Sequence, residues 1–247
     1  MKIKNDAEIK IMKEGGLILA KILKNLKNYI KPGMITMDIE KRANGLLQKY
    51  HVKSAFKGFN SYPFSTCISI NEEIVHGLPS GKLIKEGDIV GIDFGVRHKG
   101  YNTDSAFTIG IGKINQKNQK LIDITKKSLD NAIQKIKPGV HLGDIQAVIQ
   151  KTIVDNKLVL VKNLTGHGIG KNLQEEPIIE NFGQAGEGII LAPGMVFCLE
   201  PMATFGNGKI SVSPDGWTIV TSDATLSAHF EHTIVVTKKN CEVLTKF

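Results

Sequence analysis

The chain has 247 residues, of which 41% are hydrophobic and 23% are charged, a composition typical of a soluble globular enzyme. Its formal net charge is +8, but the basic residues are scattered and form no dense block with interleaved aromatics, so we expect no specific nucleic-acid partner. The three cysteines share no CxxC spacing, and no apolar run reaches membrane-spanning length, which argues against a disulfide framework, a zinc ribbon and a membrane protein. Together with a polar N-terminus, these features predict a cytoplasmic protein.

Helical patterns begin the chain. Apolar residues recur at three- and four-residue steps over residues 5–28, and Asn5 with Glu8 forms a capping-box pattern. A second helix is predicted over residues 36–50, and strands are predicted over residues 66–70, 88–95 and 104–109. The same order then repeats, with helices over residues 118–136 and 143–156 and strands over residues 188–191, 195–200, 217–221 and 232–237.

Two echoes in the sequence indicate an internal duplication. The Lys-Pro-Gly turn ending at Gly33 recurs at Gly139, 106 residues later, and the strand after Gly87 recurs after Gly194, 107 residues later. Two independent motifs that recur at nearly the same spacing favour two related halves, at about residues 1–110 and 111–247. Because no Pro- or Ser-rich linker separates them, we expect a single catalytic domain over residues 1–247. The second echo places carboxylates at matching strand ends, Asp93 and Glu200.

Two aspartates are predicted to share one face of a hairpin. Asp93 ends an apolar strand, Asp104 begins the next strand 11 residues later, and residues 96–101 form a natural hairpin link. Two antiparallel strands joined in this way can place both carboxylates within reach of the same cation. A pair of aspartates alone is weak evidence, since turns and helix caps also use them.

Three further residues are candidate metal ligands. His167 lies in a glycine-rich stretch, Glu200 ends an apolar strand, and Glu231 precedes a strongly apolar one. Carboxylates beside apolar runs are costly unless something neutralises them. One imidazole with four carboxylates suits Mn²⁺, Fe²⁺, Co²⁺ or Zn²⁺. Five ligands exceed what one catalytic zinc needs and fit two divalent ions bridged by carboxylates and a water.

The motifs as a whole resemble the type I methionine aminopeptidases in order and spacing, over nearly the whole chain. They are His76-Gly77, Asp93, Thr103-Asp104-Ser105, GHGIG from Gly166, EEP from Glu175, LEPM from Leu199 and EHTIVV from Glu231, with CISINE from Cys67 and DGWT from Asp215. This resemblance implies an α/β (α+β) architecture, the pita-bread fold. In that fold two pseudo-symmetric halves of antiparallel sheet, covered by helices, surround one central dinuclear metal site.

The resemblance also implies roles. Asp93 is expected to bind one metal, Asp104 and Glu231 to bridge the two, and His167 and Glu200 to complete the other. A bridging water would attack the first peptide carbonyl, Glu200 would act as general base, and His76 would hydrogen-bond the scissile amide. The implied activity is that of a methionyl aminopeptidase, which removes the initiator methionine when the second residue is small.

The methionine pocket is expected to be apolar, because a thioether is well held by a soft aromatic lining. By resemblance its residues are Phe59, Tyr62, Cys67, Leu173 and Trp217, with Phe230 as the weakest candidate. One position departs from the family: Gln174 stands where a second histidine is usual. Its amide can donate a hydrogen bond but carries no positive charge. We therefore expect activity with weaker stabilisation of the transition state.

Two alternatives have the same fold. The first is a peptidase acting on Xaa-Pro bonds, although such enzymes usually carry an additional N-terminal domain for which 247 residues leave no room. The second is a catalytically inactive module that binds RNA or ribosomes, supported only by the net charge. The partners we expect are the N-termini of nascent polypeptides, with weak attraction to the ribosome surface, no membrane, and a monomeric state.

Overall fold

Each half of the chain opens with two helices, and in the first half these are α1 (Asp6–Tyr29) and α2 (Thr36–Lys49). The computed structural model describes residues 1–247. The predicted capping box is confirmed at α1, where Glu8 N–H donates to Asn5 Oδ1 (3.0 Å) and Asn5 N–H donates to Glu8 Oε2 (2.9 Å). Pro32 follows the end of α1, and the residue before a proline is disfavoured in helical conformation.

The first sheet is built on the two longest strands, β4 (Ile89–His98) and β5 (Tyr101–Gly110), which form an antiparallel hairpin. The two linking residues, Lys99 and Gly100, both have positive φ (46° and 87°), as two-residue hairpin turns require. Strands β1 (Lys53–Ser54) and β2 (Thr66–Ile70) pair antiparallel with β4.

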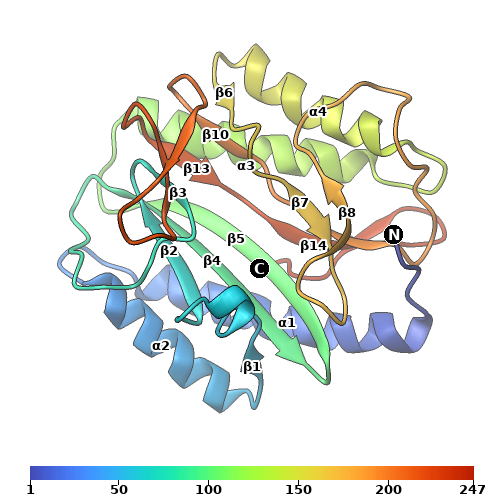
Figure 1. Cartoon of the computed structure of the whole chain (residues 1–247), viewed down its shortest axis with the longest axis horizontal. Coiled ribbons are helices and arrows are strands. Elements are labelled where there is room, and N and C mark those ends of the chain that lie inside the picture. The colour runs from blue at the N-terminus through green and yellow to red at the C-terminus, as the bar shows by residue number, and fades with distance from the viewer.

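The second half repeats this order. Helices α3 (Gln116–Lys135) and α4 (Leu142–Asp155) precede an antiparallel sheet of five strands, in the order β15-β14-β9-β7-β8. These strands are β7 (Gly166–Gly168), β8 (Glu175–Ile179), β9 (Val196–Leu199), β14 (His232–Val236) and β15 (Cys241–Val243). In Figure 1, α1 and α2 cover one end of the molecule and α3 and α4 the other, with β4 and β5 running between them.

Two smaller antiparallel sheets complete the fold. One has the order β13-β10-β6 and the other β11-β12-β3. Their strands are β3 (Glu73–Val75), β6 (Val159–Leu160), β10 (Met202–Thr204), β11 (Ile210–Val212), β12 (Ile219–Thr221) and β13 (Ser227–His229), and a short 3₁₀ helix, η1, covers Phe59–Ser61. No helix combines the length and hydropathy needed to cross a membrane.

The two main sheets meet where β5 lies against β14. Glu231 N–H donates to Ala106 O (2.9 Å), and Asp104 N–H donates to Thr233 Oγ1 (2.8 Å), which in turn donates to Asp104 O (2.8 Å). A single hydrophobic cluster, containing both Phe94 and Phe197, extends through the two halves. This junction brings residues from β5 and β14 to the middle of the molecule.

One predicted strand is wrong. Residues 188–191 do not form a strand, and only Ile190 makes an isolated bridge, with His141. Gly188 has a φ of 80°, which extended backbone does not adopt, and Ile189 and Ile190 are exposed. Of the strands in the two smaller sheets, only β12 was predicted, within the strand expected over residues 217–221. The others have two or three residues, too few to show a periodic pattern.

Candidate metal centre and active site

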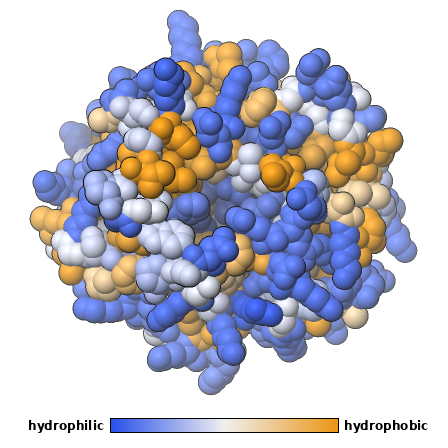
Figure 2. All heavy atoms as spheres, viewed as in Figure 1, coloured by the Kyte–Doolittle hydropathy of each residue, from blue (hydrophilic) through white to orange (hydrophobic).

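A cavity of about 300 Å³ opens between the two halves. Figure 2 shows this face of the molecule hollowed near its centre, where hydrophilic and hydrophobic side chains meet. All but one of the site residues predicted from the sequence line the cavity, namely Phe59, Tyr62, Cys67, His76, Asp93, Asp104, His167, Leu173, Gln174, Glu200, Trp217 and Glu231. Phe230, the weakest candidate, instead packs in the main core and lines a separate cavity with Phe107 and His232.

Three carboxylates converge from the hairpin and the opposing sheet. Asp93 lies on β4 and Asp104 on β5, on one face because Asp93 pairs with Ala106, two residues from Asp104. Glu231 immediately precedes β14, which lies against β5. Oxygen atoms of Asp93, Asp104 and Glu231 all lie within 4.8 Å of one another, close enough to share a cation.

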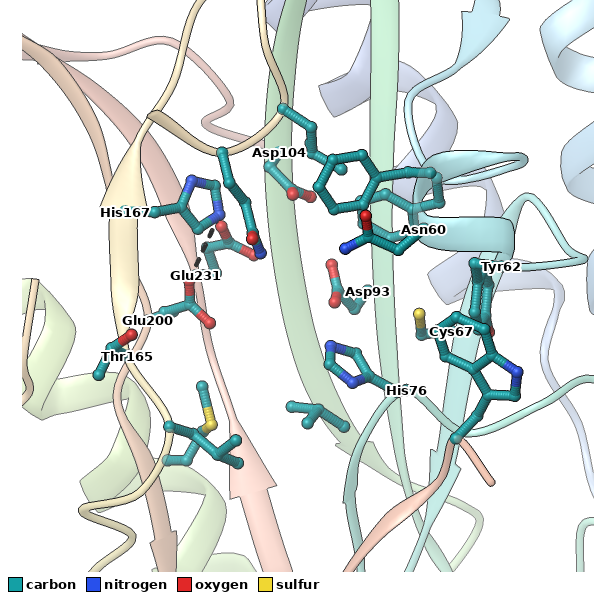
Figure 3. A pocket seen from close by; sticks show the side chains of 18 of the residues that line it. Asn60, Tyr62, Cys67, His76, Asp93, Asp104, Thr165, His167, Glu200 and Glu231 are labelled. Atoms are coloured by element: carbon teal, nitrogen blue, oxygen red, sulfur yellow. Dashed lines mark ion pairs between the residues drawn. The ribbon is translucent and has the colours of Figure 1, made fainter. Parts of the chain in front are cut away.

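His167 and Glu200 complete the group from β7 and the end of β9. His167 Nδ1–H donates to Gly168 O (2.9 Å), since a carbonyl can only accept, and the lone pair on Nε2 is left free. His167 Nε2 lies 3.7 Å from Glu200 Oε1. Figure 3 shows both side chains facing the carboxylates of the other half. Such a backbone hydrogen bond is how metal-binding histidines are commonly oriented.

The glycines around His167 are required by close packing of the strands. A Cβ atom on Gly166 would lie 2.4 Å from Cys198 O, and one on Gly168 would lie 2.6 Å from Glu176 O. Side chains there would push β8 and β9 away from β7. The glycine-rich motif therefore lets neighbouring backbones approach and is not a phosphate-binding loop.

The carboxylates are electrostatically unfavourable by themselves. Burial, together with the neighbouring Asp104 and Glu231, raises the pKa of Asp93 well above its ordinary value. Burial likewise raises the pKa of Asp104 to about 7 and those of Glu200 and Glu231 well above their ordinary range. Asp93 Oδ1 and Glu231 Oε1 are buried and accept no hydrogen bond. A nearby positive charge is needed to stabilise these buried carboxylates in their ionised form.

The group fits divalent cations. No lysine or arginine side chain lines the cavity, whereas four carboxylates and an imidazole do. This donor set suits hard or borderline divalent ions. Cys198 also lies near His167 and Glu231, but its burial raises the pKa of the thiol well above its ordinary value. Cys198 Sγ lies 3.5 Å from Thr233 Oγ1, and we therefore do not count it among the ligands.

His76 sits opposite Glu200 on a strained segment. It directly follows β3 and has a φ of 59°, a left-handed conformation that is rare for residues with a side chain. Gly77 allows this path, because a Cβ there would lie 2.2 Å from Ile68 O. Burial lowers the pKa of His76, which favours the neutral imidazole. Strain of this kind is typical of functional residues.

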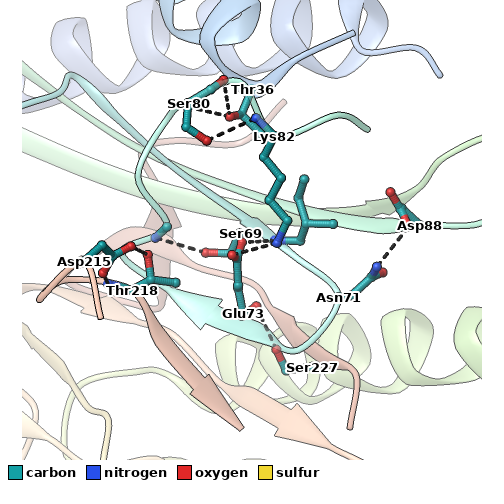
Figure 4. Close-up of polar contacts among 12 residues, drawn as sticks. Thr36, Ser69, Asn71, Glu73, Ser80, Lys82, Asp88, Asp215, Thr218 and Ser227 are labelled. Carbon is teal, nitrogen blue, oxygen red and sulfur yellow. Dashed lines mark hydrogen bonds and ion pairs between the residues drawn. The ribbon is translucent and has the colours of Figure 1, made fainter. Parts of the chain in front are cut away.

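Polar contacts hold the strand before His76 in place (Figure 4). Glu73 accepts hydrogen bonds from Ile70 N–H (2.7 Å) and from Lys82 Nζ (2.8 Å), and Ser227 Oγ donates to Glu73 O (3.1 Å). Gly77 N–H donates to Ser69 Oγ (3.4 Å). These bonds tie both sides of His76 to β2 and β13, so the imidazole is presented by a rigid segment.

The other end of the cavity is apolar. Tyr62 and Trp217 meet edge to face, with ring centroids 5.1 Å apart, and Cys67, Phe59 and Leu173 lie around them. The Tyr62 hydroxyl donates to Thr66 O (3.0 Å), so the ring is anchored to the strand that carries Cys67. An aromatic pocket with a thiol on its wall suits an unbranched thioether side chain.

Sequence reasoning missed several lining residues. They are Phe56, Asn60, Val75, Asn163, Leu164, Thr165 and Met202. Two of them could have been found from the motifs, because Thr165 directly precedes the glycine-rich stretch and Met202 is the last residue of the LEPM motif. Asn60 had none: its φ of 48° in η1, which brings it to the mouth of the cavity, is a property of the folded loop.

Comparison with known proteins agrees with this geometry. The model of metallopeptidase family M24 matches residues 10–238. The chain is 42% identical to a methionine aminopeptidase of Mycoplasma capricolum (99% of this chain and 98% of that one) and 39% identical to methionine aminopeptidase 1 of Bacillus subtilis (98% of each).

Solved structures give the same result. A methionine aminopeptidase from Thermotoga maritima superposes with a TM-score of 0.98 at 41% identity, covering all of both chains. A prolidase from Pyrococcus horikoshii gives a TM-score of 0.78 at 24% identity and shares the fold alone; this chain covers 63% of it. The resemblance and the pita-bread fold predicted from the sequence are confirmed, and the chain belongs to metallopeptidase family M24.

Proposed function

We propose that the protein is a methionyl aminopeptidase that removes the N-terminal methionine from nascent polypeptides whose second residue is small. The observation that carries this proposal is the shared cavity, in which the five potential metal ligands lie beside an apolar pocket of thioether-binding character. Relatives named methionine aminopeptidase that align over almost the full chain support it.

In this proposal Asp93, Asp104, His167, Glu200 and Glu231 hold two divalent ions, drawn from Co²⁺, Mn²⁺, Fe²⁺ and Zn²⁺. When bound, such ions polarise a carbonyl and lower the pKa of water, so that a nucleophile forms at neutral pH. They also neutralise the buried carboxylates, whose pKa values are raised in their absence.

The chain's own residues then act on the substrate. Glu200 takes the proton from the attacking water and delivers it to the departing amine. His76, held neutral and rigid, donates a hydrogen bond to the scissile amide and stabilises charge that develops there. Gln174, at the mouth of the cavity, offers an uncharged amide donor.

Selectivity comes from the apolar end of the cavity. Tyr62, Cys67 and Trp217 line this end, and no lysine or arginine lines the cavity, so burial of an acidic first residue would be uncompensated. Phe59 and Leu173 complete the wall. An unbranched methionine side chain fills such a pocket with little strain.

We further propose that the halves at about residues 1–110 and 111–247 form one catalytic domain and that the protein acts as a cytoplasmic monomer. The shared hydrophobic cluster supports the first point. The +8 net charge favours weak attraction to the ribosome surface. Size-exclusion chromatography with light scattering tests the oligomeric state.

The direct test compares two peptides on the purified, metal-loaded protein. Release of methionine from Met-Ala-Ser, with no cleavage of Ala-Pro, is expected, and Glu200→Gln serves as the inactive control. The measurement is repeated with Mn²⁺, Fe²⁺, Co²⁺ and Zn²⁺ to identify the activating ion. Cleavage of Ala-Pro alone would establish the Xaa-Pro alternative. Tight RNA binding without methionine release under any metal would establish the inactive binding module.

A further inference from the structure

A third histidine, His229, lies beside Glu200 and has no role in the mechanism proposed above. It ends β13, opposite Met202 of β10, and is 3% exposed. Its backbone N–H donates to Thr108 Oγ1 (2.9 Å), and Thr108 Oγ1 donates to its carbonyl (2.9 Å), so the main chain is firmly held. These bonds fix the Cα position from which the imidazole reaches Glu200.

The imidazole carries an unpaired polar atom. His229 Nε2 is fully buried and has no hydrogen-bond partner. A buried nitrogen without a partner costs free energy, and native structures rarely retain one without a reason. The nearest opposite group is Glu200, whose Oε2 lies 3.7 Å from His229 Nε2.

Glu200 thus lies between two imidazoles. Its Oε1 faces His167 Nε2 and its Oε2 faces His229 Nε2, both at 3.7 Å. The two histidines differ in what they offer. His167 donates from Nδ1 to a backbone carbonyl and presents a lone pair at Nε2, whereas no backbone carbonyl accepts from His229. His229 can therefore present an N–H at Nε2.

We infer that His229 is a positioning residue for Glu200. Its Nε2–H donates to Glu200 Oε2 after a small rotation that shortens the 3.7 Å approach. This bond fixes the plane of the carboxylate and turns Oε1 toward the cavity. The inference rests on the proposed function, because it matters most if Glu200 carries the proton.

Two variants separate positioning from packing. His229→Leu keeps a similar apolar volume and removes the donor, while His229→Gln keeps an N–H at a comparable reach. For His229→Leu we expect a kcat for Met-Ala-Ser about 10- to 100-fold lower with little change in KM, and weaker Mn²⁺ binding by calorimetry, as for other residues that orient metal ligands. His229→Gln is expected to restore most of both quantities.

Unfolding of the metal-free variants is the control for packing. His229→Leu is expected to unfold close to wild type, because the leucine fills a similar volume and only one hydrogen bond is removed. Unchanged kcat and Mn²⁺ affinity in His229→Leu would overturn the inference, as would a loss that tracks instability and is not rescued by His229→Gln. If the wild type releases no methionine, the proposed function fails, and the Mn²⁺ affinities of the variants still decide the role of His229.

Discussion

A buried ion pair next to the active-site mouth offers a sharp test of how the N-terminal segment supports the cavity. Lys4 Nζ lies 2.8 Å from Glu175 Oε2, with side-chain exposures of 2% and 14%. Lys4 N–H also donates to Gly194 O (2.8 Å), and Asn172 N–H donates to Glu175 Oε1 (3.2 Å). The pair therefore ties the N-terminal segment to the loop that carries Gln174 into the cavity.

Lys4→Met removes the cation and leaves the carboxylate in place. Breaking a buried pair by deleting one partner typically costs about 3–5 kcal/mol, and we expect about 3 kcal/mol because Glu175 retains some contact with water. For a chain of this size, that loss lowers the midpoint of thermal unfolding by roughly 6–12 °C. The freed loop should also raise KM for Met-Ala-Ser, since Leu173 and Gln174 belong to it.

The effect should depend on pH. Burial by itself would raise the pKa of Glu175, but the hydrogen bonds from Lys4 and Asn172 outweigh it and hold the pKa below the ordinary value of 4.5. A carboxyl whose pKa is lowered by folding contributes stability above its unfolded pKa and loses it as pH falls through the folded value. The destabilisation by Lys4→Met should therefore be complete near pH 7 and shrink below about pH 4.5.

Urea unfolding of the metal-free protein measures the change without linkage to metal binding. Glu175→Met is the matched single variant, and Lys4→Met/Glu175→Met completes the cycle. Replacing both charges by apolar groups is often neutral, so the double variant should recover most of the stability. The stabilising role of the pair is refuted if Lys4→Met changes the free energy of unfolding by less than about 0.5 kcal/mol, the range of ordinary surface substitutions. It is also refuted if the double variant is no more stable than Lys4→Met.

Three further outcomes are expected. Gln174→His should raise kcat/KM for Met-Ala-Ser by about 10- to 100-fold by adding a charged donor, and steady-state kinetics showing no gain would contradict this. Metal-free protein should lose stability as pH rises from about 4 through 7, because burial raises the pKa of Asp104 to about 7 in the folded state and its ionisation there opposes folding. Thermal scans with and without Mn²⁺ should therefore show that stabilisation by the metal grows over this pH range. A stabilisation that stays constant with pH would contradict the prediction. Gly77→Ala should destabilise the protein by about 1–3 kcal/mol and impair turnover, because the added Cβ meets Ile68 O at 2.2 Å. Unchanged unfolding and activity would show that the segment around His76 is not rigid.

Much of the site could be anticipated because the chemistry limits the residue types. Carboxylates next to apolar strands need neutralisation, and this requirement made Asp93, Asp104, Glu200 and Glu231 candidate metal ligands in the sequence. The hairpin between β4 and β5 then places the two aspartates on one face, since side chains alternate along a strand. The family motifs extended this to the apolar end of the cavity.

Other features depend on contacts between distant segments. Lys4 pairs with Glu175 across 171 residues, and His229 approaches Glu200 only because β13, β10 and the end of β9 are brought together. No local pattern predicts either contact. The expected strand over residues 188–191 was wrong because Gly188 has a φ of 80°, a backbone conformation that the apolar run after it does not reveal.

The sequence by itself determined the order of the main helices and strands and a set of residues whose chemistry suits a metal ion, because periodicity and side-chain chemistry are local properties. The tertiary structure alone decided which oxygen of Glu200 faces which imidazole, and which loop Lys4 restrains. Those arrangements depend on how the two sheets pack at the junction of β5 and β14, and packing between sheets leaves no periodic trace in the chain.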